Sequence, residues 1–583
     1  MSAATIDTRF VPTVPLTALQ DAGALTVQAG GHTIALFLYD GEVFAIDNRC
    51  PHMGFPLDKG TVKDGLLACH WHHARFDLRT GGTFDQFADD VRAFPAEVRD
   101  GTIYIDVAPQ PDRHDYYLER LQVGLERDIP LVIAKAVIYL LDNEGDPTLP
   151  FRIGLEFGCQ NSLFGWGAGL TVLSGMMNML PHLDADERPR ALYHGLSMVA
   201  REVEGSPPRF PIRPLPGAPS DIPTLKAWFR QFIEVRDDEG AERCIVSALA
   251  AGATPAEMAD MLFAAVTDHR YIDVGHPADF TNKALEALDK AGWDLAPVVL
   301  PSLVRGYARA ARMEERNAWR YPIDIIEILA ATFAAFPAQI AIEPSGRPIA
   351  HWRDQLVPHL LADDPKATVA AMLAALNEGC SMVELASVVT YAAARRIAHF
   401  HVSNEFSDWD TALHTFTFSN AIECGLRRAP SPELLRGVFD AAMSVYLDRF
   451  LNIPSTRLPQ PNGNGAAPAD LLARFNGLLN QQQQVNEAAS LTASYLASGG
   501  EPAGLLAKLG EMLLREDRDF HTLQSVEAAI AQYNQLGADP AAGHILTAAA
   551  RYLAAHAPTV RAQGQTYRIA VRLHRGERLF EGD

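Results

Sequence analysis

The feature that most constrains this chain is a pair of short motifs, Cys50-Pro-His52 and Cys69-His-Trp-His72, with sixteen residues between them. Each motif combines one thiol and one imidazole, two ligand types that suit soft and borderline transition metals. Asp-Gly pairs tolerate the positive φ angles of tight hairpin turns. Such pairs separate runs of β-forming residues at 40–41, 64–65 and 100–101. The sequence therefore predicts a metal centre on a small antiparallel β-domain, with a structural zinc site as one interpretation.

The stretch CPHMGFPLDKGTVKDGLLACHWHHARFDLRTGG resembles the Rieske iron–sulfur family along its whole length, specifically the ferredoxin-like branch that serves bacterial oxygenases. The resemblance extends over about residues 10–108 and implies a [2Fe–2S] cluster. It assigns Cys50 and Cys69 to one iron. It assigns His52 and His72 to the other, at the exposed tip of the domain. Because neutral imidazoles replace two thiolate charges, such a cluster is easier to reduce than one held by four cysteines.

Residues around these ligands place the domain in the low-potential part of the family. Phe55 and Trp71 stand where the respiratory branch has two disulfide-forming cysteines. Ala74 and Phe76 stand where that branch has hydroxyls that donate to the cluster sulfurs. Hydrogen bonds to sulfur stabilise the added electron. We therefore expect a potential near the low end of the Rieske range, about −150 mV.

Two further histidines lie beside the ligands, at 70 and 73. His73 stands where the family usually has glycine, so we expect backbone strain there if the position needs a positive φ. An extra ring at this point could also tune the cluster. Both His70 and His73 are predicted to be bystanders and not ligands.

Composition limits the classes of function and the compartment. The 583 residues carry a formal net charge of −21, which disfavours broad binding to nucleic acid or anionic membranes, since both need basic patches. Six cysteines are too sparse for a disulfide framework and favour a reducing compartment. The first residues lack a signal-peptide pattern, and no uncharged apolar run reaches the roughly 18 residues of a membrane span. We therefore expect a cytoplasmic protein without a membrane span.

The chain beyond the β-domain, which we expect over 1–108, is predicted to be helical. From about Tyr116, alanine and leucine dominate and apolar residues recur at helical spacing. A stretch rich in proline, glycine and asparagine at 452–470 suggests a boundary. We predict an all-α domain over 116–455 and a C-terminal helical segment over 470–583. The expected fold class is a multi-domain α and β protein, with a small antiparallel β Rieske domain followed by a large all-α region.

Two segments of the helical region begin with the same chemistry. Thr254 with Glu257, and Ser381 with Glu384, each fit a capping box. In a capping box the hydroxyl caps the helix and the glutamate bonds back to the first residue. A diverged internal repeat would explain the similarity, but helix-start chemistry alone could also produce it.

A Rieske domain moves single electrons, so the helical region is where a site that uses them is expected. Rieske oxygenases hold a mononuclear iron with two histidines and one carboxylate, often written D-x-x-H-x-x-x-x-H. The nearest fragment here begins at Asp273 and His276 but has Thr281 in place of the second histidine. The catalytic domain of that family is also mixed α/β, so its iron site is not transferred to this chain.

Helical bundles can also hold metals through inward-facing glutamate and histidine side chains. Each histidine taken alone is most simply a surface or capping residue. The set as a whole leaves open a second metal, expected to be iron, or an acid–base site. The weak candidates for catalytic residues are Asp268, His269, His276, His401 and His414. Residues weighed with them are His194, Asp273, His399, Glu405, Glu516, Asp519 and His521.

Three hypotheses of function fit these features. In the favoured one, a reductase or ferredoxin reduces the cluster, and the electrons reach a site in the helical region for oxygen-dependent chemistry on a small apolar substrate. In the second, the chain is a non-catalytic electron carrier or redox sensor whose helical part docks a partner. In the third, the helical region is a cofactor-free enzyme and the Rieske domain is regulatory. The sequence leaves the substrate, the reductase and the oligomeric state open.

Overall fold

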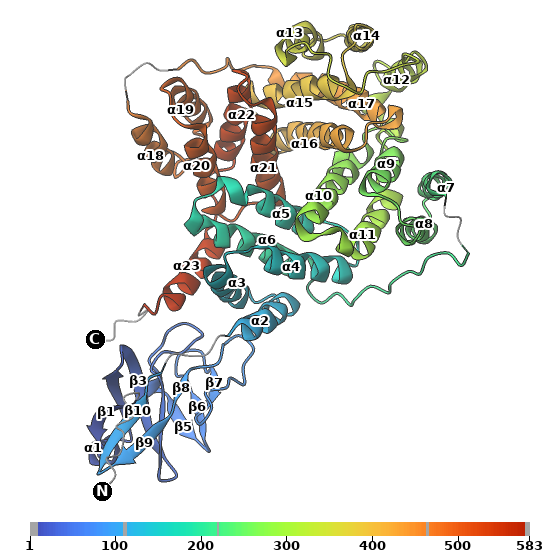
Figure 1. Cartoon of the computed structure of the whole chain (residues 1–583). Helices are drawn as coiled ribbons and strands as arrows, with labels where there is room; N and C mark the ends of the chain where they lie inside the picture. Colours follow the sequence, from blue (N-terminus) through green and yellow to red (C-terminus); the bar gives the residue numbers. More distant parts are fainter. Residues whose placement is uncertain (1–9, 109–112, 218–220, 462–465, 578–583) are drawn as a thin grey trace. The chain divides into compact units, whose positions relative to one another are not determined.

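The computed structural model describes residues 10–108, 113–217, 221–461 and 466–577. Contacts divide the chain into two compact units, one of Met1–Asp146 with Gln565–Asp583 and one of Pro147–Gly564. An antiparallel β-domain comes first along the chain and a large helical region follows it (Figure 1). The predicted fold class is therefore confirmed.

The β-domain of the first unit consists of short antiparallel strands in three sheets. Their strand orders are β1-β10-β9, β2-β3-β4-β8 and β5-β6-β7. A short helix, α1 (Leu16–Ala22), follows β1. The strand bounds are β1 Phe10–Pro15, β2 Ala24–Ala29, β3 His32–Tyr39, β4 Glu42–Asp47, β5 Thr61–Lys63, β6 Leu66–Ala68, β7 Arg75–Asp77, β8 Ala93–Phe94, β9 Ala96–Arg99 and β10 Thr102–Asp106.

Hairpin turns lie at the predicted Asp-Gly pairs, which join β3 to β4, β5 to β6 and β9 to β10. Both residues of every pair have a positive φ, from 47° at Asp100 to 79° at Gly41. This geometry matches the right-handed twist of the flanking strands. One of the two apolar clusters of the domain includes Cys50 and Cys69 together with Phe76. The two cysteine motifs are therefore anchored in a packed core.

Besides α1, three of the described helices belong wholly or mostly to the first unit: α2 (His114–Glu126), α3 (Pro130–Glu144) and α23 (Ala562–His574). α2 and α3 pack against each other. Nε2 of His574, the last residue of α23, lies 2.8 Å from a carboxylate oxygen of Asp142 in α3. The last described helix is therefore part of the same compact unit as the first described strand.

The second unit is all-helical, and its helices pack largely as neighbouring pairs such as α5 with α6 and α15 with α16. Among the described helices, none is both long and apolar enough to cross a membrane. The bounds of its first ten helices are α4 Thr148–Asn161, α5 Ala168–Met179, α6 Arg188–Val203, α7 Ile222–Glu234, α8 Asp238–Ala250, α9 Pro255–Val266, α10 His276–Ala291, α11 Ala296–Arg309, α12 Ile325–Ala334 and α13 Ile349–Leu360. Those of the following helices are α14 Pro365–Asn377, α15 Met382–Ala398, α16 Phe406–Arg428, α17 Pro432–Leu447, α18 Pro468–Leu478, α19 Val485–Ala497, α20 Pro502–Leu514, α21 Phe520–Leu536 and α22 Ala542–Ala555.

The helices α5, α10, α16 and α21 lie together in the middle of this unit (Figure 1). α10 packs against α5 and α16, and α21 packs against the same two helices. α10 and α21 thus face a common interior from opposite sides. Many of the side chains in that interior are buried and polar.

Both predicted capping boxes are present, at the starts of α9 and α15. The compact units are grouped differently from the predicted segments, because α21 packs against α5 and α16, and α22 packs against α15. These C-terminal helices therefore share the main helical core. The stretch at 452–470, part of which lies outside the described residues, connects helices of one unit.

Candidate functional site

The two cysteine motifs form loops with the same backbone geometry. In each loop the cysteine N–H donates to the carbonyl five residues later, at 2.8 Å for Cys50 and 2.9 Å for Cys69. The N–H four residues after each cysteine donates back to the cysteine carbonyl, at 2.7 Å from Gly54 and 3.1 Å from His73. Gly54 and His73 are therefore equivalent, and their φ angles are 84° and 61°. The positive φ on which strain at His73 depends is therefore present, and left-handed backbone disfavours a residue with a Cβ.

The side chains predicted to hold the cluster converge at these loops. Each cysteine is 1% exposed. A hydrogen bond between the thiols lowers the pKa of Cys69 to about 6 and raises that of Cys50. The rings of His52 and His72 lie 4.8 Å apart between centroids. Nδ1 of His52 is buried without a hydrogen-bond partner, whereas the His72 side chain is exposed. Two thiols and two imidazoles, one with an unused buried nitrogen, fit a Rieske-type [2Fe–2S] cluster.

The surroundings of these residues agree with the low-potential interpretation. The rings of Phe55 and Trp71 lie 6.3 Å apart where the respiratory branch has its disulfide. Ala74 and Phe76 are fully buried and offer no side-chain donor to a cluster sulfur. Nε2 of His70 lies 2.6 Å from the hydroxyl of a threonine in β5, which suits a bystander.

A buried ion triad lies beside the first cysteine loop. Nζ of Lys135 in α3 lies 2.8 Å from one carboxylate oxygen of Asp89, and Nε of Arg120 in α2 lies 3.1 Å from the other. Lys135 also donates to the carbonyl of Pro51, the residue between the cysteine and the histidine of that loop. Two cations share one carboxylate, so a net positive charge is held against the predicted cluster.

Replacing Lys135 by methionine is expected to lower the reduction potential of the cluster, because a nearby positive charge stabilises the more negative reduced form. A unit charge about 10 Å away contributes about 1.5 kcal/mol at an effective dielectric constant of about 20. For a one-electron couple this corresponds to about 60 mV. An EPR redox titration measures the shift. Lys135→Arg keeps the charge and should leave the potential near the wild-type value, and an unchanged potential in Lys135→Met would contradict the argument.

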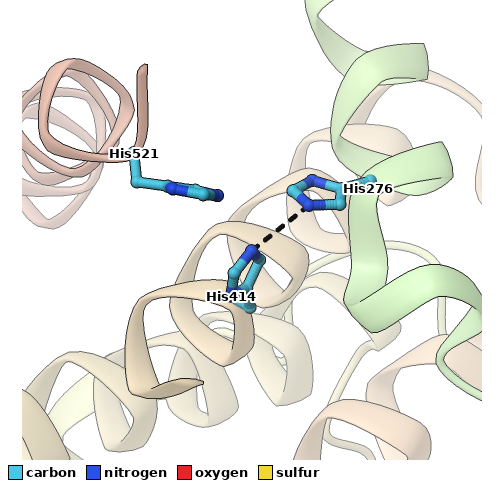
Figure 2. Close-up of side chains that lie close together, drawn as sticks. All are labelled: His276, His414 and His521. Atoms are coloured by element: carbon cyan, nitrogen blue, oxygen red, sulfur yellow. Dashed lines mark hydrogen bonds between the residues drawn. The ribbon is translucent and has the colours of Figure 1, made fainter. Parts of the chain in front are cut away.

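A second group of convergent side chains lies in the helical unit, where three imidazoles from three helices point toward one another (Figure 2). His276 is the first residue of α10, His414 lies in α16 and His521 lies in α21. One nitrogen of each ring lies within 4.8 Å of the other two, and Nε2 of His414 is 3.2 Å from Nε2 of His276. We call these residues the histidine triad. Imidazole nitrogens in such a group suit a transition metal.

Hydrogen bonding and burial leave lone pairs of the histidine triad available. Nδ1–H of His414 donates to the Asp410 carbonyl at 2.7 Å, so its Nε2 is unprotonated and accepts from Nε2–H of His276. A bound metal would take the place of that hydrogen. Nε2 of His521 is buried without a hydrogen-bond partner. Burial, followed by the neighbouring rings, lowers the pKa of His276 to about 3 and that of His414 to about 4. Both are therefore neutral at pH 7, the form in which histidine binds metals.

The backbone that leads into His276 has an unusual conformation. Val274 and Gly275 have φ angles of 51° and 97°, and a β-branched residue such as valine is strained in this region. A Cβ added to Gly275 would lie 2.7 Å from Cβ of Phe418 in α16. This close approach of α10 to α16 places His276 opposite His414. Backbone strain of this kind clusters at functional sites.

The remaining sequence candidates lie in other environments. Asp268 forms an ion pair with an arginine of α7, with 2.5 Å between the charged atoms. His269 lies within 3.0 Å of two glutamate carboxylates. Nδ1 of His401 lies 2.9 Å from a serine hydroxyl two residues later. None of these three residues joins the histidine triad.

Two members of the histidine triad, His276 and His414, were among the weak candidates for catalytic residues. The third, His521, was considered only in the wider set of residues. His521 follows the N-cap of α21, and its local sequence carries no metal motif. α9 ends at Val266 and α10 begins at His276, so Gly275 and Pro277 flank the first residue of a new helix.

Comparison with known proteins bears on the first unit. The model of the Rieske [2Fe-2S] domain matches residues 10–95, which include all four predicted ligands. The ferredoxin subunit of 3-phenylpropionate/cinnamic acid dioxygenase from Photorhabdus laumondii is 42% identical over 94 residues, 16% of this chain and 89% of that protein. The ferredoxin component of the p-cumate 2,3-dioxygenase system from Pseudomonas putida is 36% identical over 83 residues, 14% of this chain and 70% of that protein. A solved ferredoxin of carbazole 1,9a-dioxygenase from Nocardioides aromaticivorans IC177 is 27% identical, with a TM-score of 0.16, and the match covers 17% of this chain and 98% of that chain.

Proposed function

The chain belongs, through residues 10–95, to the Rieske [2Fe–2S] family, and we propose on this basis that it is an oxidoreductase that uses electrons at a site of its own. The Rieske domain receives electrons one at a time from a reductase or a ferredoxin. His276, His414 and His521 would hold an iron, which would supply the site where these electrons are used. The observation that carries the proposal is the convergence of three imidazoles in a chain that also has a Rieske domain.

In the Rieske domain, Cys50 and Cys69 hold one iron of the cluster and His52 and His72 hold the other. The bound cluster supplies one-electron transfer. Exposure of His72 supports its role as the point where electrons enter or leave. Two relatives are by name ferredoxins of dioxygenase systems, which supports a reductase as the partner of this chain. None of the six cysteines forms a disulfide, which supports a reducing compartment, the cytoplasm.

In the helical unit, the choice of metal follows from the need for redox chemistry. A site of three histidines also suits zinc, but zinc has no redox chemistry. An electron delivered by the Rieske domain needs a metal that changes oxidation state, and imidazole is a good ligand for iron. Three protein ligands leave coordination positions free for oxygen or substrate.

The reaction class that uses both sites is the reductive activation of oxygen. One O2, two electrons, two protons and one substrate C–H bond give one C–OH bond and one water. The reductase supplies both electrons through the Rieske domain. The rings of Phe280 and Phe520 lie 5.2 Å and 5.7 Å from the ring of His276. These two apolar rings beside His276 support a small apolar substrate.

Iron quantification with EPR on the purified full-length protein tests the proposal. We expect iron beyond the two atoms of a [2Fe–2S] cluster, and loss of the excess in His276→Ala. After anaerobic reduction, added oxygen should oxidise the Rieske cluster faster in wild type than in His276→Ala. Cluster iron alone in wild type, with no other metal, would contradict the helical site. It would favour an electron carrier or sensor whose helical part docks a partner.

A further inference from the structure

Buried polar side chains continue from the histidine triad along the facing surfaces of α10 and α21. On α10, Asp279, Lys283 and Glu286 follow His276 at intervals of three or four residues, so they share one face of the helix. On α21, Gln524 and Glu527 follow His521 at intervals of three residues. We call these five residues after the histidines the polar ladder.

The two helices are joined across this surface by successive side-chain pairs. The rings of His276 and His521 are stacked, with 5.9 Å between their centroids. One turn further along, the amide of Gln524 donates to a carboxylate oxygen of Asp279. After another turn, Nζ of Lys283 lies 2.6 Å from a carboxylate oxygen of Glu527. The polar ladder is therefore a series of side-chain pairs, about one helical turn apart, between the two helices.

The far end of the polar ladder reaches a cavity. Nζ of Lys283 lies 2.9 Å from Glu286, and the amide of Asn178 in α5 donates to Glu286 at 2.8 Å and to Glu527 at 3.0 Å. These three residues, Asn178, Glu286 and Glu527, line a cavity of about 330 Å³ together with Asp289. The Asp289 side chain is 42% exposed, so the cavity opens to solvent. The row thus runs from a cavity open to solvent toward the starts of α10 and α21, which carry His276 and His521.

Stability alone does not account for this row. Asp279, Lys283 and Glu527 are 2%, 1% and 3% exposed. Burying charged groups costs several kcal/mol each, and apolar replacements of buried ion pairs are often neutral or stabilising. One carboxyl oxygen of Asp279 is also buried without a partner, and a buried unsatisfied oxygen destabilises a fold further.

The charges of the row suit proton transfer. Burial raises the pKa of Asp279 to about 8, so its carboxyl group holds a proton at pH 7. Although burial opposes it, the carboxylates of Glu286 and Glu527 raise the pKa of Lys283. The neutral carboxylic acid of Asp279 is therefore followed along the row by the protonated side chain of Lys283.

We propose that the polar ladder is a proton path from the cavity to the histidine triad, and that Asp279 is its last donor. This inference rests on the proposed function, because oxygen reduction consumes one proton for each electron delivered. Asp279 gives its carboxyl proton to the site and becomes a carboxylate. Lys283 then gives a proton to Asp279. The carboxylate of Glu527 or Glu286 takes a proton from solvent in the cavity and passes it to Lys283, which restores both groups.

The test uses the iron-loaded full-length protein, reduced anaerobically and mixed with oxygen in H2O and in D2O. The rate at which the Rieske absorption returns is recorded for wild type and Asp279→Asn. We expect Asp279→Asn to slow this step about 100-fold, the range for a positioned proton donor, and to increase the solvent isotope effect. Iron content and thermal unfolding should stay as in wild type. Glu527→Gln, further from the triad, should also slow the step.

Asp448 provides a matched control, because it is a second buried carboxyl group of the helical unit and is 5% exposed. It accepts a hydrogen bond from Thr415 at 2.7 Å, and burial raises its pKa to about 7. Asp448→Asn should reoxidise at the wild-type rate. Iron-loaded Asp279→Asn with a wild-type rate and isotope effect would overturn the proton path while leaving the proposed function in place.

Infrared spectroscopy of the metal-free protein gives a readout that does not depend on iron. A protonated carboxylic acid band at pH 7 should weaken in Asp279→Asn, and an Asp279 that is ionised at pH 7 would overturn the inference by itself. A wild-type protein that binds no iron at the triad would overturn the proposed function and the proton path together. The two failures are therefore distinguishable.

Discussion

Replacing His414 by alanine is expected to remove the iron of the helical unit and the oxygen-dependent reaction with it, while the Rieske EPR signal stays unchanged. His414 is central because its Nδ1–H is fixed by the Asp410 carbonyl, so Nε2 faces the other rings as a lone-pair donor. Losing only an outer hydrogen-bond partner of a ligand weakens metal binding by about 10- to 100-fold. Loss of a ligand should weaken iron binding by at least about 100-fold.

Two measurements distinguish an effect on the histidine triad from an effect on the Rieske cluster in this variant. Total iron by elemental analysis should fall, and spin quantification of the reduced cluster should not. His401→Ala is the control, since His401 was also a sequence candidate but contacts only a neighbouring serine among the hydrogen bonds of its ring. His401→Ala should keep the wild-type total iron and the wild-type spin count of the reduced cluster. Full iron content in His414→Ala would contradict the assignment of the histidine triad as a metal site.

The cluster site could be predicted in detail because its determinants are local in sequence. Each loop supplies a cysteine and a histidine within four residues, and Asp-Gly pairs set the neighbouring hairpins. Even the strain at His73 follows from its equivalence to Gly54 within the loop geometry. The net charge beside the cluster could not be predicted, because Lys135 and Arg120 reach Asp89 from helices outside the motif.

The histidine triad could be predicted only in part, because it depends on which helices meet. His276 and His414 lie 138 positions apart, and helical periodicity predicts which face of a helix is buried but not what it is buried against. Gly275 and Pro277 lie on either side of His276 at the start of α10. Local signals of this kind mark a break in the helical pattern, and the close approach of α10 to α16 then decides where His276 points.

The predicted boundary at 452–470 shows again that local sequence does not reveal which helices pack together. Proline, glycine and asparagine mark a connection outside regular secondary structure. They do not say whether the helices on either side share a core. Here α21 and α22 pack against α5, α15 and α16, and that packing brings His521 to the other two rings.

The second large effect is expected in the Rieske domain, where replacing His72 by cysteine should lower the reduction potential by about 100 mV or more. All-cysteine plant-type clusters lie near −400 mV, whereas Rieske clusters begin near −150 mV. Replacing one of the two imidazoles by a thiolate adds one negative charge to the cluster. We therefore expect the reduction potential to fall by part of the difference between the two cluster types. A redox titration followed by EPR measures both the potential and the change in the spectrum.

His70→Cys is the matched control for this experiment, because it introduces the same side chain two residues away at a position that contacts a threonine hydroxyl. A general electrostatic effect of a new thiol on the loop would shift the potential in both variants. A ligand exchange would shift the potential and alter the EPR spectrum in His72→Cys alone. Equal shifts in the two variants, or an unchanged potential in His72→Cys, would therefore contradict the assignment of His72 as a cluster ligand.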